Sequence, residues 1–100
     1  MSAPRSYWVY VLASQTRGAL YIGVTGNLRE RIGQHRGGEL AGFTNRYRVT
    51  RLVHAEEFSD VHEAIAREKA MKKWNRAWKI DLIEPGNPDW RDLRFDLHLV

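Results

Sequence analysis

Residues 7–24, YWVYVLASQTRGALYIGV, decide the fold of this 100-residue chain, because they predict two strands joined by a short turn. Residues 7–13 are rich in β-branched and aromatic side chains, which favour strands. Residues 14–18 (SQTRG) are typical of a turn, and residues 19–24 (ALYIGV) again favour a strand. The stretch therefore predicts an antiparallel β-hairpin with a five-residue loop.

A helix is predicted directly after the hairpin, over residues 28–35. Asn27 is a good N-cap residue, and Glu30 three positions later completes a capping-box pattern. The glycines at 37 and 38 are suitable residues for the C-terminal end. One face of this helix combines two aliphatic and two polar side chains at helical spacing: Leu28, Arg31, Ile32 and His35.

The rest of the chain predicts a loop over residues 39–46, a third strand over 47–58 and a second helix that starts after Ser59 or Asp60. A break near Trp74–Asn75 separates it from a short third helix that ends at Ile83, before Pro85. Residues 84–93 are predicted to be irregular and anchored by Trp90. The order ββαβαα predicts an α+β fold, in which three helices flank a three-stranded antiparallel sheet. A packing stripe is expected at Trp74, Trp78 and Leu82.

The composition is that of one ordinary globular domain, with 43% hydrophobic and 28% charged residues. The chain has no cysteine, which excludes disulfides, thiol catalysis and cysteine-containing zinc sites. It contains no apolar run long enough to span a membrane and begins without the features of a signal peptide. We therefore expect a cytoplasmic protein that makes no use of a membrane.

The net charge of +4 is small, but the positive residues gather in two blocks, residues 28–51 and 67–79. Aromatic residues, among them Trp74 and Trp78, are interleaved with these blocks. Basic surface combined with aromatic platforms is expected of a protein that binds nucleic acid. Solvated basic faces of helices and strands are the alternative explanation. The candidate nucleic-acid-binding residues are Arg29, Arg36, Arg46, Arg48, Lys69, Lys72, Lys73 and Arg76.

Five residues stand out as candidates for chemistry. Tyr10 and Tyr21 lie on the two hairpin strands, where a buried tyrosine usually has a structural role. Arg31 and His35 are four residues apart on the first predicted helix. Glu68 falls on the apolar face of the second helix, where a carboxylate needs a partner. Its partner is either a metal ion or Arg31 in an ordinary salt bridge.

Taken together, these residues resemble the motifs of the GIY-YIG nuclease superfamily. Trp8-Val9-Tyr10 is followed, after ten residues, by Tyr21-Ile22-Gly23, and Arg31, His35 and Glu68 come in the family's order. The likeness is closest to the small stand-alone YhbQ-like branch, and it extends from residue 7 to about residue 93. Residues 1–100 are therefore expected to form a single domain of this kind. Trp8 and Val9 depart from the Gly and Ile of the first motif, but both suit a strand.

The resemblance implies hydrolysis of phosphodiester bonds in DNA with one divalent metal, Mg²⁺ or Mn²⁺. It implies Glu68 as the metal ligand, Arg31 as a phosphate contact, and Tyr10 as the general base or the group that orients the attacking water. Tyr21 would hold Tyr10 or the water, and His35 would relay a proton or contact the phosphate. Asn87 is the candidate for a further, late asparagine of the family, with Asn75 as the alternative.

The substrate is less closely defined than the chemistry. The resemblance implies DNA rather than RNA, and without a second module to read base edges we expect selectivity for DNA structure, as in repair or recombination. A nucleic-acid-binding module that does not cleave is the alternative function, because fold alone does not establish function. A third alternative is a metal-free structural or partner-binding protein. The sequence does not indicate an oligomeric state.

Overall fold

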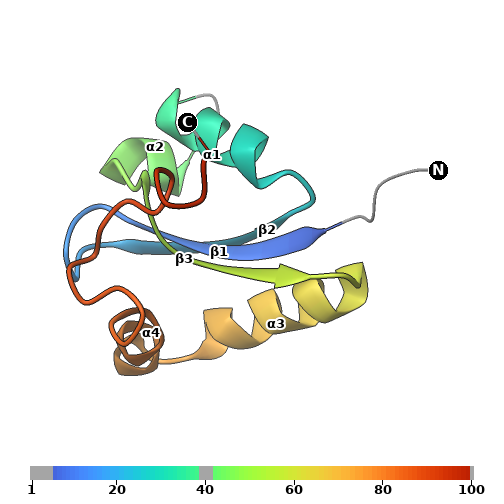
Figure 1. Ribbon diagram of the computed structural model, residues 1–100. Coiled ribbons are helices and arrows are strands. Elements are labelled where there is room, and N and C mark those ends of the chain that lie inside the picture. The colour runs from blue at the N-terminus through green and yellow to red at the C-terminus, as the bar shows by residue number, and fades with distance from the viewer. Residues whose placement is uncertain (1–5, 39–41, 100) are drawn as a thin grey trace.

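The computed structural model describes residues 6–38 and 42–99, whose three strands form one antiparallel sheet (Figure 1). The strands β1 (Tyr7–Ala13), β2 (Leu20–Thr25) and β3 (Arg51–Phe58) lie in the order β2-β1-β3. β1 and β2 pair as the predicted hairpin, with Val11 opposite Ile22. The central position of β1 explains why residues 9–13 are all buried.

Helices cover both faces of the sheet (Figure 1). The helices α1 (Leu28–Arg36) and α2 (Phe43–Tyr47) lie on one face, and α3 (Val61–Lys73) and α4 (Arg76–Ile83) lie on the other. Alternation along β1 divides the core in the same way. Val9 and Val11 pack with the α3 side, whereas Tyr10 and Leu12 pack with α1.

The predicted helix starts are confirmed by their caps. The Asn27 side chain accepts a hydrogen bond from the backbone N–H of Glu30 and donates one to the Glu30 carboxylate. The second bond differs from that of a capping box, because the backbone N–H of Asn27 donates to Thr25 instead. Asp60 caps α3 by accepting from the N–H of His62. These local bonds satisfy N–H groups that have no partner within a helix.

Three predictions were wrong in detail. The described part of residues 39–46 is not all loop, because α2 begins at Phe43, and residues 39–41 lie outside the described residues. The chain reverses direction at Arg48, which has a φ of 57°, so that β3 begins at Arg51 rather than at 47. In the predicted packing stripe, Trp74 before α4 and Leu82 within it pack against the core, but the Trp78 side chain is 58% exposed.

The irregular C-terminal segment is anchored by Trp90, as predicted. Its side chain is fully buried, and its indole N–H donates to Glu84 at 2.8 Å. The segment then returns to the α1 face, where Leu93 and Leu99 pack against the core. Across the described residues, no helix is both long and apolar enough to cross a membrane.

Candidate active site

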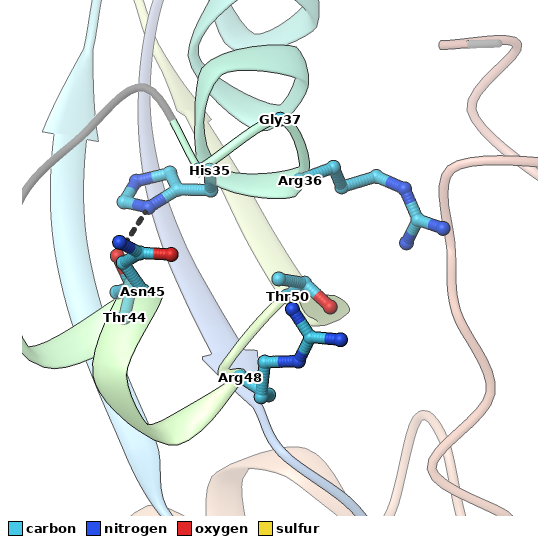
Figure 2. Close-up of a pocket in the computed structure, with 8 residues that line it drawn as sticks. His35, Arg36, Gly37, Thr44, Asn45, Arg48 and Thr50 are labelled. Atoms are coloured by element: carbon cyan, nitrogen blue, oxygen red, sulfur yellow. Dashed lines mark hydrogen bonds between the residues drawn. The ribbon is translucent and has the colours of Figure 1, made fainter.

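A chain of hydrogen bonds links Tyr10 to α1 and α2. The Tyr10 hydroxyl lies 3.0 Å from Nε2 of His35. Nδ1 of the same imidazole lies 3.0 Å from the Thr44 hydroxyl, a contact drawn in Figure 2. All three side chains are buried. His35 is thus held at both ring nitrogens, which fixes the orientation of its ring.

Tyr21 completes a cluster of three rings. Its ring centroid lies 6.2 Å from that of Tyr10 and 5.2 Å from that of His35. The cluster depends on Gly23, which lies opposite Tyr10 in the sheet. A Cβ atom at this position would collide with the Tyr10 hydroxyl and the ring carbon that carries it. The glycine of the Tyr-Ile-Gly triplet therefore makes room for the Tyr10 phenol.

The surroundings keep both Tyr10 and His35 neutral. Burial, reinforced by Tyr21, raises the pKa of the Tyr10 phenol, while the positive charge of Arg31 opposes this rise. Burial lowers the pKa of His35, and Arg31 lowers it further. A neutral His35 can accept a hydrogen bond from Tyr10 at Nε2 when its proton lies on Nδ1, directed at Thr44.

Arg31 is the cation of this cluster. It is half-buried, and together with Thr25, Asn27 and Glu30 it lines a hollow of about 300 Å³ at the start of α1. Among the described residues, no carboxylate forms an ion pair with it. The guanidinium can therefore bind an anionic group that enters the hollow.

Glu68 projects from α3, which packs on the opposite face of the sheet from Tyr10 and His35. The salt bridge between Arg31 and Glu68, considered from the sequence, is absent from the described contacts, because Glu68 pairs with Lys72 at 3.3 Å. Lys72 lines a hollow of about 240 Å³ with Tyr21 and Lys79. Lys72, the partner of Glu68, thus brings α3 to a hollow that Tyr21 of the edge strand β2 also lines.

The residue before Glu68, Arg67, attaches α3 to the sheet. Arg67 makes two hydrogen bonds to Glu56 of β3, at 2.8 and 3.1 Å. His54 contacts the same carboxylate at 2.7 Å. These contacts, the one from His54 first, lower the pKa of Glu56 to about 2. The network attaches α3 to the sheet one residue before Glu68.

The carboxylates and histidines of the described residues fit a metal site with a single protein ligand, completed by water and substrate. Within residues 6–38 and 42–99, no three His, Asp or Glu side chains lie close enough together to hold an ion. A dedicated protein cage is therefore not formed by these residues. A single carboxylate such as Glu68, only 14% exposed, suits Mg²⁺, which keeps most of its waters and takes further oxygens from a substrate phosphate.

Neither candidate for the late asparagine has a free side chain. Asn87 is buried, donates to the carbonyl oxygens of Val53 and Arg91, and accepts from the N–H of Arg91. Asn75 caps α4 by accepting from the N–H of Trp78 at 2.9 Å. Both amides are bonded to the backbone in the structure, so a catalytic role for Asn87 stays a prediction.

The two basic blocks lie on opposite faces of the sheet. Arg29, Arg36, Arg46 and Arg48 belong to the α1 and α2 side, and Lys69, Lys72, Lys73 and Arg76 belong to the α3 and α4 side. Arg29 donates to the carbonyl of His98, and Arg36 pairs with Asp92. Arg76 donates to the carbonyl oxygens of Arg17 and Gly18 in the hairpin loop. These three residues have structural partners in addition to any role in binding.

His35 also lines a polar hollow of about 340 Å³ (Figure 2). Its lining includes Thr44 and Thr50 and the basic side chains of Arg36 and Arg48. The His35–Thr44 pair forms part of its wall. The hollow thus brings two basic side chains close to the hydrogen bond between His35 and Thr44.

Two residues of the site were not singled out from the sequence. Thr44 lies in the stretch predicted as a loop, where no pattern distinguished it. Gly23 was noted only as a letter of the second motif, although a glycine within a strand is itself a signal of close packing. The structure explains both residues through their contacts with His35 and Tyr10.

The fold and this cluster agree with the comparison against protein families. The model of the GIY-YIG catalytic domain matches residues 6–81. The chain therefore belongs to the GIY-YIG family. Its relatives include a UPF0213 protein of Staphylococcus haemolyticus, 36% identical over 78% of this chain and 94% of the relative. Another, from Lacticaseibacillus paracasei, is 30% identical over 89% of this chain and 99% of the relative.

A solved structure supports the same assignment. The solution NMR structure of the UPF0213 protein BH0048 from Bacillus halodurans has a TM-score of 0.55 and 28% identity to this chain. The match covers 87% of this chain and 92% of that one. The predicted family, the stand-alone domain type and the α+β sheet are confirmed by these comparisons.

Proposed function

We propose that the protein is a metal-dependent endonuclease that hydrolyses phosphodiester bonds in DNA. The observation that carries the proposal is the connected cluster of Tyr10, Tyr21 and His35 beside Arg31, an arginine without a carboxylate partner among the described residues. Membership of the GIY-YIG family supports a nuclease-like function. Residues 1–100 would act as one catalytic module. We place it in the cytoplasm, because a chain without cysteine suits a reducing compartment.

Arg31 would bind a non-bridging oxygen of the scissile phosphate. Its planar guanidinium matches two oxygens of a phosphate, and the hollow that it lines is open to a ligand. Tyr10 does not line this hollow, but the charge of Arg31 also opposes the rise in the pKa of the Tyr10 phenol, so Arg31 would link the bound phosphate to the tyrosine.

Tyr10 and His35 would then handle the proton of the attacking water. The raised pKa keeps Tyr10 protonated in the free protein, so a preformed phenolate is not the base. Instead the Tyr10 oxygen would take the proton of the water while its own proton passes to Nε2 of His35. Tyr21 packs on both rings and holds them in register.

Glu68 is the residue that would hold the divalent cation, Mg²⁺ or Mn²⁺. When bound, the ion would stabilise the charge that develops on the phosphate and on the leaving oxygen. Glu68 pairs with Lys72 at 3.3 Å, and Lys72 lines the hollow that Tyr21 and Lys79 also line. Structure-selective cleavage of branched or nicked DNA, as in repair or recombination, is the substrate class we propose.

A non-catalytic nucleic-acid-binding module is the second candidate. The raised pKa of Tyr10 and the Lys72 ammonium beside Glu68 both favour it, because each opposes one part of the catalytic arrangement. The two candidates make opposite predictions for one experiment.

That experiment is a cleavage panel of labelled single-stranded, duplex, flap and branched DNA, with RNA alongside, in Mg²⁺ or Mn²⁺ and in EDTA. We expect the wild-type protein to cut at least one DNA with metal and Glu68→Ala to cut none. Glu63→Ala is the matched control, since Glu63 is an exposed acid of the same helix. Cleavage by Glu68→Ala at the wild-type rate would overturn the assignment, and binding in EDTA without any cleavage would establish the second candidate.

A further inference from the structure

The exposed Trp78 has no part in the core and none in the site described above. Its side chain is 58% exposed, whereas the buried Trp90 is fully enclosed. With Trp74, Asp81 and Leu82 it lines a hollow of about 260 Å³ on the outer side of α4. A large aromatic side chain left open to solvent beside a hollow is a common feature of binding surfaces.

The two tryptophans are arranged so that Trp78 remains available. Trp74 packs against the core and has the Arg67 guanidinium 5.0 Å from its ring centroid. The Trp74 and Trp78 rings meet nearly at right angles, at 78° and 6.2 Å between centroids. This contact supports Trp78 from one side and leaves a flat aromatic surface at the hollow.

The charges around the hollow indicate what it binds. Lys72 and Lys73 precede Trp74, and Lys79 follows Trp78 directly. Within the described part of the chain, no carboxylate pairs with Lys73 or Lys79. Aromatic surface beside unpaired lysines is complementary to a nucleic acid strand, whose bases stack while its phosphates face the ammonium groups.

A second hollow is lined by Lys79, the sequence neighbour of Trp78, together with Lys72 and Tyr21. The two hollows share no lining residue, but Trp78 and Lys79 are consecutive residues of α4. A nucleic acid strand whose phosphate lies between Lys72 and Lys79 would therefore pass from Tyr21 toward Trp78. The carboxylate of Asp81 disfavours a phosphate in the Trp78 hollow itself and favours a base, which carries hydrogen-bond donors.

We propose that the hollow of Trp74, Trp78, Asp81 and Leu82 binds an unpaired nucleobase of the DNA substrate, which stacks on Trp78. The proposal rests on the proposed function, because it assumes that nucleic acid is the substrate. It also adds to that function, since a base is available for stacking only in a single-stranded or flapped region. The protein would thus select DNA with an unpaired segment beside the cleaved phosphate.

The test is binding of a labelled single-stranded oligonucleotide and of a blunt duplex, measured by fluorescence anisotropy in EDTA so that nothing is cleaved. We expect Trp78→Ala to weaken single-strand binding about tenfold or more, the size of one lost base–aromatic stack. Duplex binding should stay unchanged, because the bases of a blunt duplex are already stacked. Trp78→Phe should restore most of the single-strand affinity.

Phe95→Ala is the matched control, since Phe95 is an equally exposed aromatic residue, 59%, in the C-terminal segment. Equal single-strand affinity of Trp78→Ala and wild type, or an equal loss in Phe95→Ala, would overturn the proposal. The proposal would also be overturned if sedimentation showed that the wild-type protein is a dimer and the Trp78→Ala variant a monomer, because a second copy would then cover the hollow. If wild type cleaves DNA while Trp78→Ala binds normally, this inference falls and the proposed function stands. If single-strand binding depends on Trp78 but the wild-type protein cleaves no DNA, the base-binding hollow stands and the proposed nuclease function falls.

Discussion

The Tyr10 hydroxyl lies 3.0 Å from Nε2 of His35, although the two residues are 25 positions apart in the sequence. Tyr10 is on the central strand and His35 is on the last turn of α1. Their contact joins the first motif of the family to the helix that carries Arg31.

Gly23→Ala tests whether the motif glycine makes room for Tyr10. The added methyl group would collide with the Tyr10 hydroxyl, so we expect the free energy of unfolding in urea to fall by about 1–3 kcal/mol. Gly33→Ala is the control, because nothing lies within 4 Å of a Cβ at this exposed position within α1. That change should stabilise the protein by roughly 0.5–1 kcal/mol. Equal effects of the two changes would contradict the packing argument.

Thr44→Val tests whether the Thr44 hydroxyl positions His35. Valine keeps the shape of the side chain but leaves Nδ1 of a buried imidazole without its partner. We expect cleavage to slow about tenfold, equivalent to one net hydrogen bond, through kcat rather than KM. Thr44→Ser should cut nearly as well as wild type. If the valine variant keeps the wild-type kcat, Thr44 has only a structural role.

The titration of His35 is expected to lie below the usual range of a histidine. Burial lowers its pKa first and Arg31 second, so Arg31→Met should raise the pKa without restoring it fully. Because folded His35 holds its proton more weakly than the unfolded chain does, stability should fall as the pH drops from about 6.5 through the folded pKa. NMR titration of the histidine rings measures the pKa of His35 in both proteins, and urea denaturation at a series of pH values measures the change in stability. A pKa unchanged by Arg31→Met would show that the two groups are not coupled.

Glu56→Gln tests the network that attaches α3 to the sheet. The pKa of Glu56 is lowered to about 2 by its contacts with His54 and Arg67. The lowered pKa means that its stabilising effect is complete above about 4.5 and is lost as the pH falls toward 2. We expect the variant to unfold at pH 7 with about 1–2 kcal/mol less free energy than wild type. The difference should vanish near pH 2.

Glu57→Gln is the control for this change, since Glu57 is the exposed neighbour of Glu56 on the same strand. Chemical denaturation at a series of pH values gives the comparison. A gap between Glu56→Gln and wild type that persists at pH 2 would mean that charge on Glu56 is not its cause.

Much of the fold could be predicted because its signals are local. The hairpin follows from strand-forming residues around residues 14–18, and α1 follows from the Asn27 cap and the spacing of its apolar face. The helix α2 was missed because it has only five residues and no side-chain cap. Trp78 was placed in the core because its spacing from Trp74 is helical, and spacing alone does not show where a helix meets the sheet.

The site residues were predicted as a set, but not their arrangement. Tyr10, Tyr21, Arg31 and His35 lie on strands and a helix that are adjacent in the sequence, so their proximity follows from the hairpin and α1. Glu68 comes from a helix on the other face, and its partner Lys72 lies four residues later on the same helix, a spacing that is visible in the sequence. The face of the sheet that α3 covers is decided by the packing of the whole core and leaves no local pattern.

Cleavage by Tyr10→Phe tests the central claim most directly, because this change removes one hydroxyl and nothing else. Tyr7→Phe is the matched control, since Tyr7 is on the same strand but packs on the α3 side. In Mg²⁺, with the DNA panel described above, we predict that wild type and Tyr7→Phe cleave alike and that Tyr10→Phe is slower by about 100-fold or more. A Tyr10→Phe protein that cleaves at the wild-type rate, or a wild-type protein that cuts none of these DNAs, would contradict the account.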